Sequence, residues 1–586
     1  MNQERRVGSR YRQTALAFLI ASIASPSAST LRNGNWWGDF KAWVSRSNAA
    51  PSLCLFALNL LVCWRLVKTE YLIYFSSVEG VFIALTGYIR NHHPGYEWVG
   101  MWLGGLPFSN IYQPALFHFA AALSWITSRS PASAYHLTLA ITYSLGAVTF
   151  YLLALRVSRN RLASFLAAIL FSLFSPSTLF FPDIRRDVGS YLWARRLQCV
   201  VSYGDGPHVT GLMLAFLAVA LLIRAIRSPS SASRAMAVVA IGAVFATNWP
   251  AGVVLCIAIF CYLIAWPLED LWRITAKTGM MIALAYLLIC PIALPSVIIS
   301  TYANANRLGD APVKDAHYVF AWALLLLLLA ETRSIMFRWV ESSPMESPDD
   351  FLALDEEELG LSSVSPAFIK RVSRPPCAQG RYCFARGLHG NCPARRAPRL
   401  GVEERFVVLF AVFLSYMTLA SVFFQVRILP QPLRFHLAME AALYLLLAVM
   451  MNRLVRSSEA RAALCSAVLV VSCIQLFQYR DYARQIIRPA QIYDSIEYQT
   501  ARWFDEHMHG DRVYAPGSIS FWMNAFTETP QLSGCCDQSI INPENFISGF
   551  IIPAGYGSEA EDADYSLLWL KLGSGVKSVP VSGEQL

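Results

Sequence analysis

Between residues 50 and 477 the chain carries about eleven apolar stretches separated by polar loops. Most stretches have the roughly 17–25 residues that a helix needs to cross the hydrocarbon core of a bilayer. Because backbone polar groups cannot stay unpaired in lipid, stretches of this kind must be helical. Hydrophobic residues make up 55% of the 586 residues and charged residues only 15%, too apolar for a soluble chain. The sequence therefore predicts an all-α polytopic membrane protein.

We place eleven predicted spans on this pattern. They lie near residues 50–66, 134–156, 161–180, 209–224, 234–248, 250–266, 278–299, 317–331, 406–425, 434–452 and 461–477. The stretch from Gln113 to Thr127 is also apolar, but a span there would end the alternation of basic loops from that point on. We therefore interpret 113–127 as a re-entrant or interfacial helix.

Basic residues gather in every second loop, which sets the orientation by the positive-inside rule. They include Arg156, Arg159, Arg161, Arg224, Arg227, Arg234, Arg273, Lys277, Arg333, Arg338, Arg453, Arg456 and Arg461, as well as Arg5, Arg6, Arg10 and Arg12 at the start. The rule predicts a cytoplasmic N-terminal segment, 1–49, and an odd number of spans then places the C-terminal segment outside. The net charge of +9 fits contact with anionic lipid headgroups and does not indicate nucleic-acid binding.

The spans divide the chain into a membrane domain, 50–477, and an extracytoplasmic segment, 478–586. Two long outer loops are predicted, 67–133 and 181–208, and the inner loop 340–403 lacks periodicity and is expected to be disordered. A helical pattern from Ile496 to His507 and a strand pattern from Arg512 to Ala515 predict a small α/β segment outside. It ends at Leu586 without a closing element, so we expect it to be incomplete.

Glu79 stands just beyond the first predicted span, in Ser76-Ser77-Val78-Glu79-Gly80. A carboxylate at the membrane edge costs free energy unless something satisfies or uses it, so it is a functional candidate. The alternative is an exposed acid of the loop.

The second outer loop breaks the positive-inside rule. It carries Asp183, Arg185, Arg186, Asp187, Arg195 and Arg196, followed by Tyr203-Gly204-Asp205-Gly206-Pro207-His208. Arginine grips phosphate through two parallel hydrogen bonds, so anion binding is one explanation. Internal pairing, for example of Arg186 with Asp183, is the other. The glycines would let a tight turn present Asp205 and His208 into a cavity.

Further polar groups are predicted on the outer side. Arg307 follows the seventh span, and Arg434 and His436 open the tenth. Glu440 lies about one turn deeper, where it is either functional or the salt-bridge partner of one of these two.

The layout resembles the GT-C superfamily of membrane glycosyltransferases, which take sugar from a polyprenyl-phosphate carrier on the outer face. Three features support the resemblance: an acid after the first span, Glu79; a long first outer loop with Trp102-x-x-Gly105-x-Pro107 and Tyr112-x-Pro114; and a second loop running from Arg195-Arg196 to Asp205. In more detail the chain looks like bacterial proteins with the 6-pyruvoyl-tetrahydropterin-synthase-related membrane domain. That likeness implies a multi-pass protein of the bacterial cytoplasmic membrane.

The resemblance implies an inverting transfer of sugar, which needs a base for the acceptor and cations for the leaving phosphate. We expect Glu79 as the base, with Asp205 as helper or alternate. The expected phosphate or substrate ligands are Arg195, Arg196, Arg307, Arg434, His208, Trp102 and Tyr112.

No cofactor is expected, and the partners are membrane lipids and the polyprenyl-phosphate-linked sugar. Relatives such as oligosaccharyltransferase subunits hold a divalent metal with an Asp-x-Asp pair, whereas this chain has single acids, Glu79 and Asp205. Metal dependence is therefore not favoured. The alternative function is that of a non-catalytic protein of the same fold, or a lipid or solute transporter.

Overall fold

The computed structural model describes residues 48–93, 95, 97–191, 193–307, 316–338, 400–424, 429, 432–455, 457–515, 517–532, 534 and 576–578. The chain divides into two compact units, Met1–Leu53 with Ser334–Gly401, and Cys54–Arg333 with Val402–Leu586. Of the first unit only a few residues at the ends of helices are described. The predicted N-terminal segment and most of the predicted disordered loop lie outside the described residues, so the fold below is that of the second unit.

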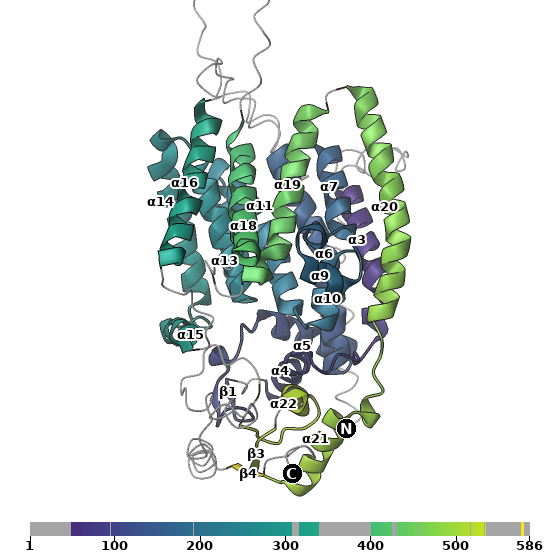
Figure 1. Cartoon of the computed structure of the whole chain (residues 1–586). Helices are drawn as coiled ribbons and strands as arrows, with labels where there is room; N and C mark the ends of the chain where they lie inside the picture. Colours follow the sequence, from purple (N-terminus) through teal and green to yellow (C-terminus); the bar gives the residue numbers. More distant parts are fainter. Residues whose placement is uncertain are drawn as a thin grey trace, which may run out of the picture. The chain divides into compact units, whose positions relative to one another are not determined.

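Eight helices in the described part of the chain are long and apolar enough to cross a membrane. They are α3 (Ala49–Cys63) with the 3-10 turn η2 (Trp64–Lys68), α6 (Pro131–Ser158), α11 (Gly206–Arg227), α14 (Leu268–Ile289), α16 (Ala316–Arg338), α18 (Val402–Phe423), α19 (His436–Leu454) and α20 (Ser458–Ile486), most of them labelled in Figure 1. Each coincides with a predicted span, so the multi-pass membrane class is confirmed.

The other three predicted spans are shorter helices. α7 (Arg161–Leu173), α12 (Ser231–Phe245) and α13 (Trp249–Ile264) have 13, 15 and 16 residues. α5 (Ala115–Thr127), predicted as re-entrant or interfacial, is also short and apolar. The total of eleven spans therefore stays a prediction.

Side-chain caps fix where several of these helices begin. Ser130, Asn160, Asn248 and Ser457 each accept a hydrogen bond from the backbone N–H three residues later, which satisfies one of the unpaired donors of the first turn. A further helix, α15 (Pro295–Arg307), follows α14 after a break that contains Pro291. The predicted span 278–299 is therefore divided between two helices.

The first predicted outer loop contains several short helices and strands. It contains α4 (Glu79–His92), a two-stranded antiparallel pair, β1 (Trp98–Val99) with β2 (Leu106–Pro107), the 3-10 turn η3 (Phe108–Asn110) and α5. The second holds α9 (Pro182–Val188) and α10 (Arg195–Ser202), and α8 (Ser177–Phe180) directly precedes it. Both loops are thus built largely from short helices.

The C-terminal segment packs on the first outer loop. It contains η7 (Ile492–Asp494), α21 (Ile496–His507), α22 (Gly517–Trp522), η8 (Met523–Ala525) and a parallel pair of short strands, β3 (Arg512–Val513) and β4 (Val576–Ser578). α21 confirms the predicted helix. The Gln531 N–H donates to the Met101 carbonyl at 2.8 Å, and the Leu103 N–H donates to the Gln531 carbonyl at 3.2 Å. The two regions predicted to lie outside are therefore in direct contact.

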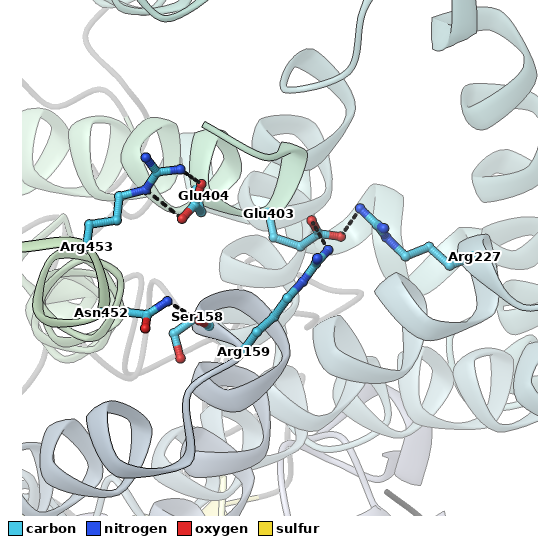
Figure 2. Close-up of polar contacts among 7 residues, drawn as sticks. All are labelled: Ser158, Arg159, Arg227, Glu403, Glu404, Asn452 and Arg453. Carbon is cyan, nitrogen blue, oxygen red and sulfur yellow. Dashed lines mark hydrogen bonds and ion pairs between the residues drawn. The ribbon is translucent and has the colours of Figure 1, made fainter. Parts of the chain in front are cut away.

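The opposite end of the bundle is closed by a cluster of ion pairs. Glu403 lies between Arg159 and Arg227 in Figure 2, and the neighbouring Glu404 accepts a hydrogen bond from Nε of Arg453 at 2.7 Å. These arginines come from three loops predicted on one face of the membrane. Their contact confirms that the three loops meet at one end, away from α4 and α22 (Figure 1). Which end faces the cytoplasm stays a prediction.

Candidate functional site

Glu79 is the first residue of α4 and is completely buried. Its Oε1 contacts Nε2 of His136, on the first turns of α6, and Nδ1 of that ring lies 2.8 Å from the Thr69 carbonyl oxygen. Because a carbonyl only accepts, Nδ1 must carry a proton, and one further proton is shared between Nε2 and Oε1. The pair is thus an acid–base couple, and the alternative that Glu79 is an exposed loop acid is wrong.

Two polar atoms beside this pair lack partners. Among the described residues, Oε2 of Glu79 and the hydroxyl of Tyr135 are buried and make no hydrogen bond. Tyr135 precedes His136 in α6 and is close enough to Glu79 and Asp205 to interact electrostatically with both. Since buried polar atoms are rarely left unpaired, these two indicate a place for a water molecule or a polar group of a ligand.

The turn before α11 closes over the same place. Gly204 has φ +69°, and a Cβ there would lie 3.1 Å from the Glu79 backbone nitrogen. A Cβ on Gly206 would lie 2.9 Å from the Tyr135 hydroxyl and 2.6 Å from Leu139. Both glycines are therefore needed for the close approach. The structure brings the predicted acids into one region, with half-buried Asp205 in the turn that covers Glu79.

A second set of polar groups adjoins Asp205. His208, on the first turn of α11, places Nδ1 3.1 Å from Oδ1 of Asn248 and Nε2 3.2 Å from the backbone carbonyl of Arg434. The Asn248 amide donates to the Tyr112 hydroxyl at 3.1 Å. Asp205 and Arg434 both interact electrostatically with His208. Asn248 thus joins Tyr112 to His208, and His208 in turn contacts the backbone of Arg434.

Arg434 differs from Arg195 and Arg196 because its side chain is exposed. In the described part of the chain its guanidinium makes no ion pair, although its backbone carbonyl is used by His208. Arg307 is the last residue of α15, and its side chain lies outside what the structure describes.

Arg195 and Arg196 have internal partners. Arg195 pairs with Asp187, donates to Gln198 and lies over the Tyr203 ring at 4.8 Å. Arg196 is buried, donates to Oδ1 of Asn59 at 2.6 Å and is covered by aromatic rings. The alternative of internal pairing, which the sequence left open, is therefore what this loop shows.

The same pairing recurs nearby. Arg186 pairs with Asp183, as that alternative proposed, and both side chains are largely exposed.

Within α10, burial raises the pKa of the Cys199 thiol to about 12, so this thiol stays protonated and unreactive.

Two further candidate residues, Trp102 and Glu440, form hydrogen bonds with other protein groups. Trp102 is buried, and its indole N–H donates to Oδ1 of Asn524 at 2.7 Å, which ties the first outer loop to the C-terminal segment. Glu440 accepts hydrogen bonds from the hydroxyls of Ser175 and Ser177, so serines take the place of the predicted salt-bridge partner among the described residues.

The described residues contain no group of three or more His, Cys, Asp or Glu that could hold a metal ion. Metal independence remains a prediction, because a site could also use ligands from the rest of the chain.

No family model and no curated protein matches the chain. Among solved structures it is similar to the apo oligosaccharyltransferase of Archaeoglobus fulgidus, with 14% identity and a TM-score of 0.47 over 90% of this chain and 69% of that one. It is also similar to the archaeal oligosaccharyltransferase AglB from Archaeoglobus fulgidus in complex with an inhibitory peptide and a dolichol-phosphate, with 13% identity and a TM-score of 0.48 over 90% and 69%. These neighbours are membrane glycosyltransferases of the GT-C superfamily, the superfamily that the sequence resembles. At these values the likeness carries no functional conclusion, which must come from the residues of this chain.

Proposed function

We propose that the chain is a membrane glycosyltransferase that moves a sugar from a polyprenyl-phosphate carrier to an acceptor at the outer membrane face. The observation that supports this most is the buried carboxylate of Glu79, whose Oε2 has no partner among the described residues and whose backbone lies against the turn that carries Asp205. A buried carboxylate with one oxygen held and the other free has the arrangement that a general base needs.

Glu79, His136 and Asp205 each have a role in the proposed reaction. The acceptor hydroxyl or amide gives its proton to Oε2 of Glu79, and its oxygen or nitrogen forms a bond to the anomeric carbon of the sugar. The bond between that carbon and the carrier phosphate breaks, and the phosphate leaves with both electrons. His136 is held by the Thr69 carbonyl, so it fixes the carboxylate through Oε1. Asp205 acts as helper or alternate base.

The leaving phosphate needs a cation near the membrane surface. Arg434 is the predicted ligand best suited to this role, because it is exposed at the start of α19 and free of ion pairs among the described residues. Its planar guanidinium can take two phosphate oxygens at once. Arg195 and Arg196 would support the site indirectly, since their side chains already hold other groups.

One observation favours the alternative of a non-catalytic protein with the same fold. The side chain of Glu79 is only 1% exposed, and His136 is completely buried, so the couple could serve stability alone. In that case the unpartnered oxygen would bind a water molecule, as buried polar atoms often do.

The test is transfer by the purified chain in liposomes that contain polyprenyl-phosphate sugars, with release of the polyprenyl phosphate as the readout. Glu79→Gln keeps the size and the contact with His136 but removes the base, so transfer should fall by about 10²–10⁴-fold. Glu97→Gln changes an exposed acid of the same outer region and serves as the matched control.

Normal membrane insertion of both variants shows that folding is unaffected. Full transfer by Glu79→Gln would exclude Glu79 as the base. Absence of transfer by the wild type with every sugar donor would favour the non-catalytic alternative.

A further inference from the structure

A cavity of about 400 Å³ lies between α4, the start of α6 and the turn that follows α22. It is separate from the couple of Glu79 and His136, neither of which lines it. Ile83, one turn further along α4 than Glu79, forms part of its wall. Its volume is in the range of sites that enclose small organic ligands.

The wall combines aromatic faces with carboxylates. Tyr71 and Phe526 stand with ring centroids 5.6 Å apart, and Tyr88 faces the cavity from α4. Asp505 and Glu528 supply the charge, and the described residues that line the cavity include no Lys, Arg or His. The lining is therefore acidic and aromatic.

The two carboxylates are not fully neutralised by their neighbours. Asp505 accepts from Thr527 at 2.8 Å and pairs with Arg502 at 2.6 Å, while its side chain stays 40% exposed. Among the described residues Glu528 pairs with His92 at 3.6 Å, and its side chain is 63% exposed. Both can therefore turn an oxygen toward a ligand.

The tyrosines add neutral groups. The Tyr88 hydroxyl donates to the Trp98 carbonyl at 2.6 Å and also interacts with the Gly100 backbone. Burial, together with the charge of Glu70, raises the pKa of Tyr71, so this ring stays uncharged. Aromatic faces attract cations, and an ammonium group offers three donors to surrounding oxygens.

We infer that this cavity binds the protonated amine of a compact ligand about the size of a monosaccharide, such as an amino sugar. Carboxylates attract the ammonium group, the aromatic rings hold the body of the ligand, and the lack of basic side chains among the described lining residues disfavours anions. The inference concerns binding and does not depend on the transfer reaction proposed above.

The experiment measures binding of glucosamine to the full chain in detergent micelles, with uncharged N-acetylglucosamine as the comparison ligand. Glucosamine should bind saturably and at least about tenfold more tightly than N-acetylglucosamine. The uncharged sugar cannot form the hydrogen bond between an ammonium group and a carboxylate, and losing one such bond accounts for a difference of this size. Asp505→Asn combined with Glu528→Gln should weaken glucosamine binding by at least about tenfold.

Two variants separate this result from loss of folding. Glu506→Gln changes the acid next to Asp505, which also contacts Arg502 but does not line the cavity, and it should bind as the wild type does. Gly87→Leu places a side chain at the cavity wall, where a Cβ meets only Pro131 at 3.6 Å, and should reduce binding with thermal stability unchanged. Equal binding of the two sugars, no saturable binding of glucosamine, or unchanged binding by the double acid variant would overturn the inference.

Discussion

The couple of Glu79 and His136 should make a large and cooperative contribution to stability. The two side chains are 1% and 0% exposed, so either one left alone would be a buried polar or charged group that has lost its charge partner. Removing one member of such a pair costs about 3–5 kcal/mol, whereas replacing both with apolar side chains costs much less. We therefore expect Glu79→Leu and His136→Leu each to destabilise the chain by about 3 kcal/mol or more.

The double variant decides whether the two residues act as a couple. Glu79→Leu with His136→Leu should be less destabilised than the sum of the single variants, with a coupling free energy of at least about 2 kcal/mol. The measurement is equilibrium unfolding in mixed micelles, followed by tryptophan fluorescence. The exposed pair of Arg186 and Asp183 is the control, and it should show no measurable coupling. Strict additivity at Glu79 and His136 would refute the reasoning.

Further predictions concern orientation, packing, carrier binding and metal. Single cysteines at Ser231, beyond α11, and at His509, after α21, should be labelled from opposite sides of the membrane; labelling from one side would contradict the topology. Native Cys199, whose pKa burial raises to about 12, should not react with maleimide at neutral pH, and rapid labelling would refute its packing. Arg434→Gln should weaken polyprenyl-phosphate binding about tenfold or more, and unchanged binding would remove Arg434 from the site. Transfer should survive EDTA, whereas loss restored by Mg²⁺ would show that a metal is needed.

The sequence predicted the long helices well because their signal is local. The length and composition of an apolar stretch predict a membrane span, and the spacing of apolar residues predicts α21. α4 has no such signal, since its 14 residues include two glycines within a loop rich in aromatic residues. It is stabilised by α22, more than 400 residues away, where a Cβ on Gly80 would lie 2.6 Å from the Phe521 carbonyl. A contact between such distant segments leaves no trace in the local pattern.

The site was predicted in part for the same reason. Glu79 and Asp205 can be predicted as site residues because an acid at a membrane edge is a functional candidate. His136 was overlooked although it lies inside the predicted span 134–156, where an ionisable residue is itself a functional signal. Asn248 has no charge to single it out in the sequence, although the structure joins it to His208 and Tyr112. The pairing of Arg195 with Asp187 could not be predicted, because spacing along an irregular loop does not fix which charges meet.

The two ends of the bundle use strong polar groups differently. At one end the carboxylates of Glu403 and Glu404 are each paired with guanidinium groups, which holds the ends of α6, α11, α18 and α19 together (Figure 2). At the other end Oε2 of Glu79 and the Tyr135 hydroxyl have no partner among the described residues. Leaving buried polar atoms unpaired costs stability, about 1–3 kcal/mol for each group. A water molecule or a polar group of a ligand that bonds to Oε2 of Glu79 would offset this cost.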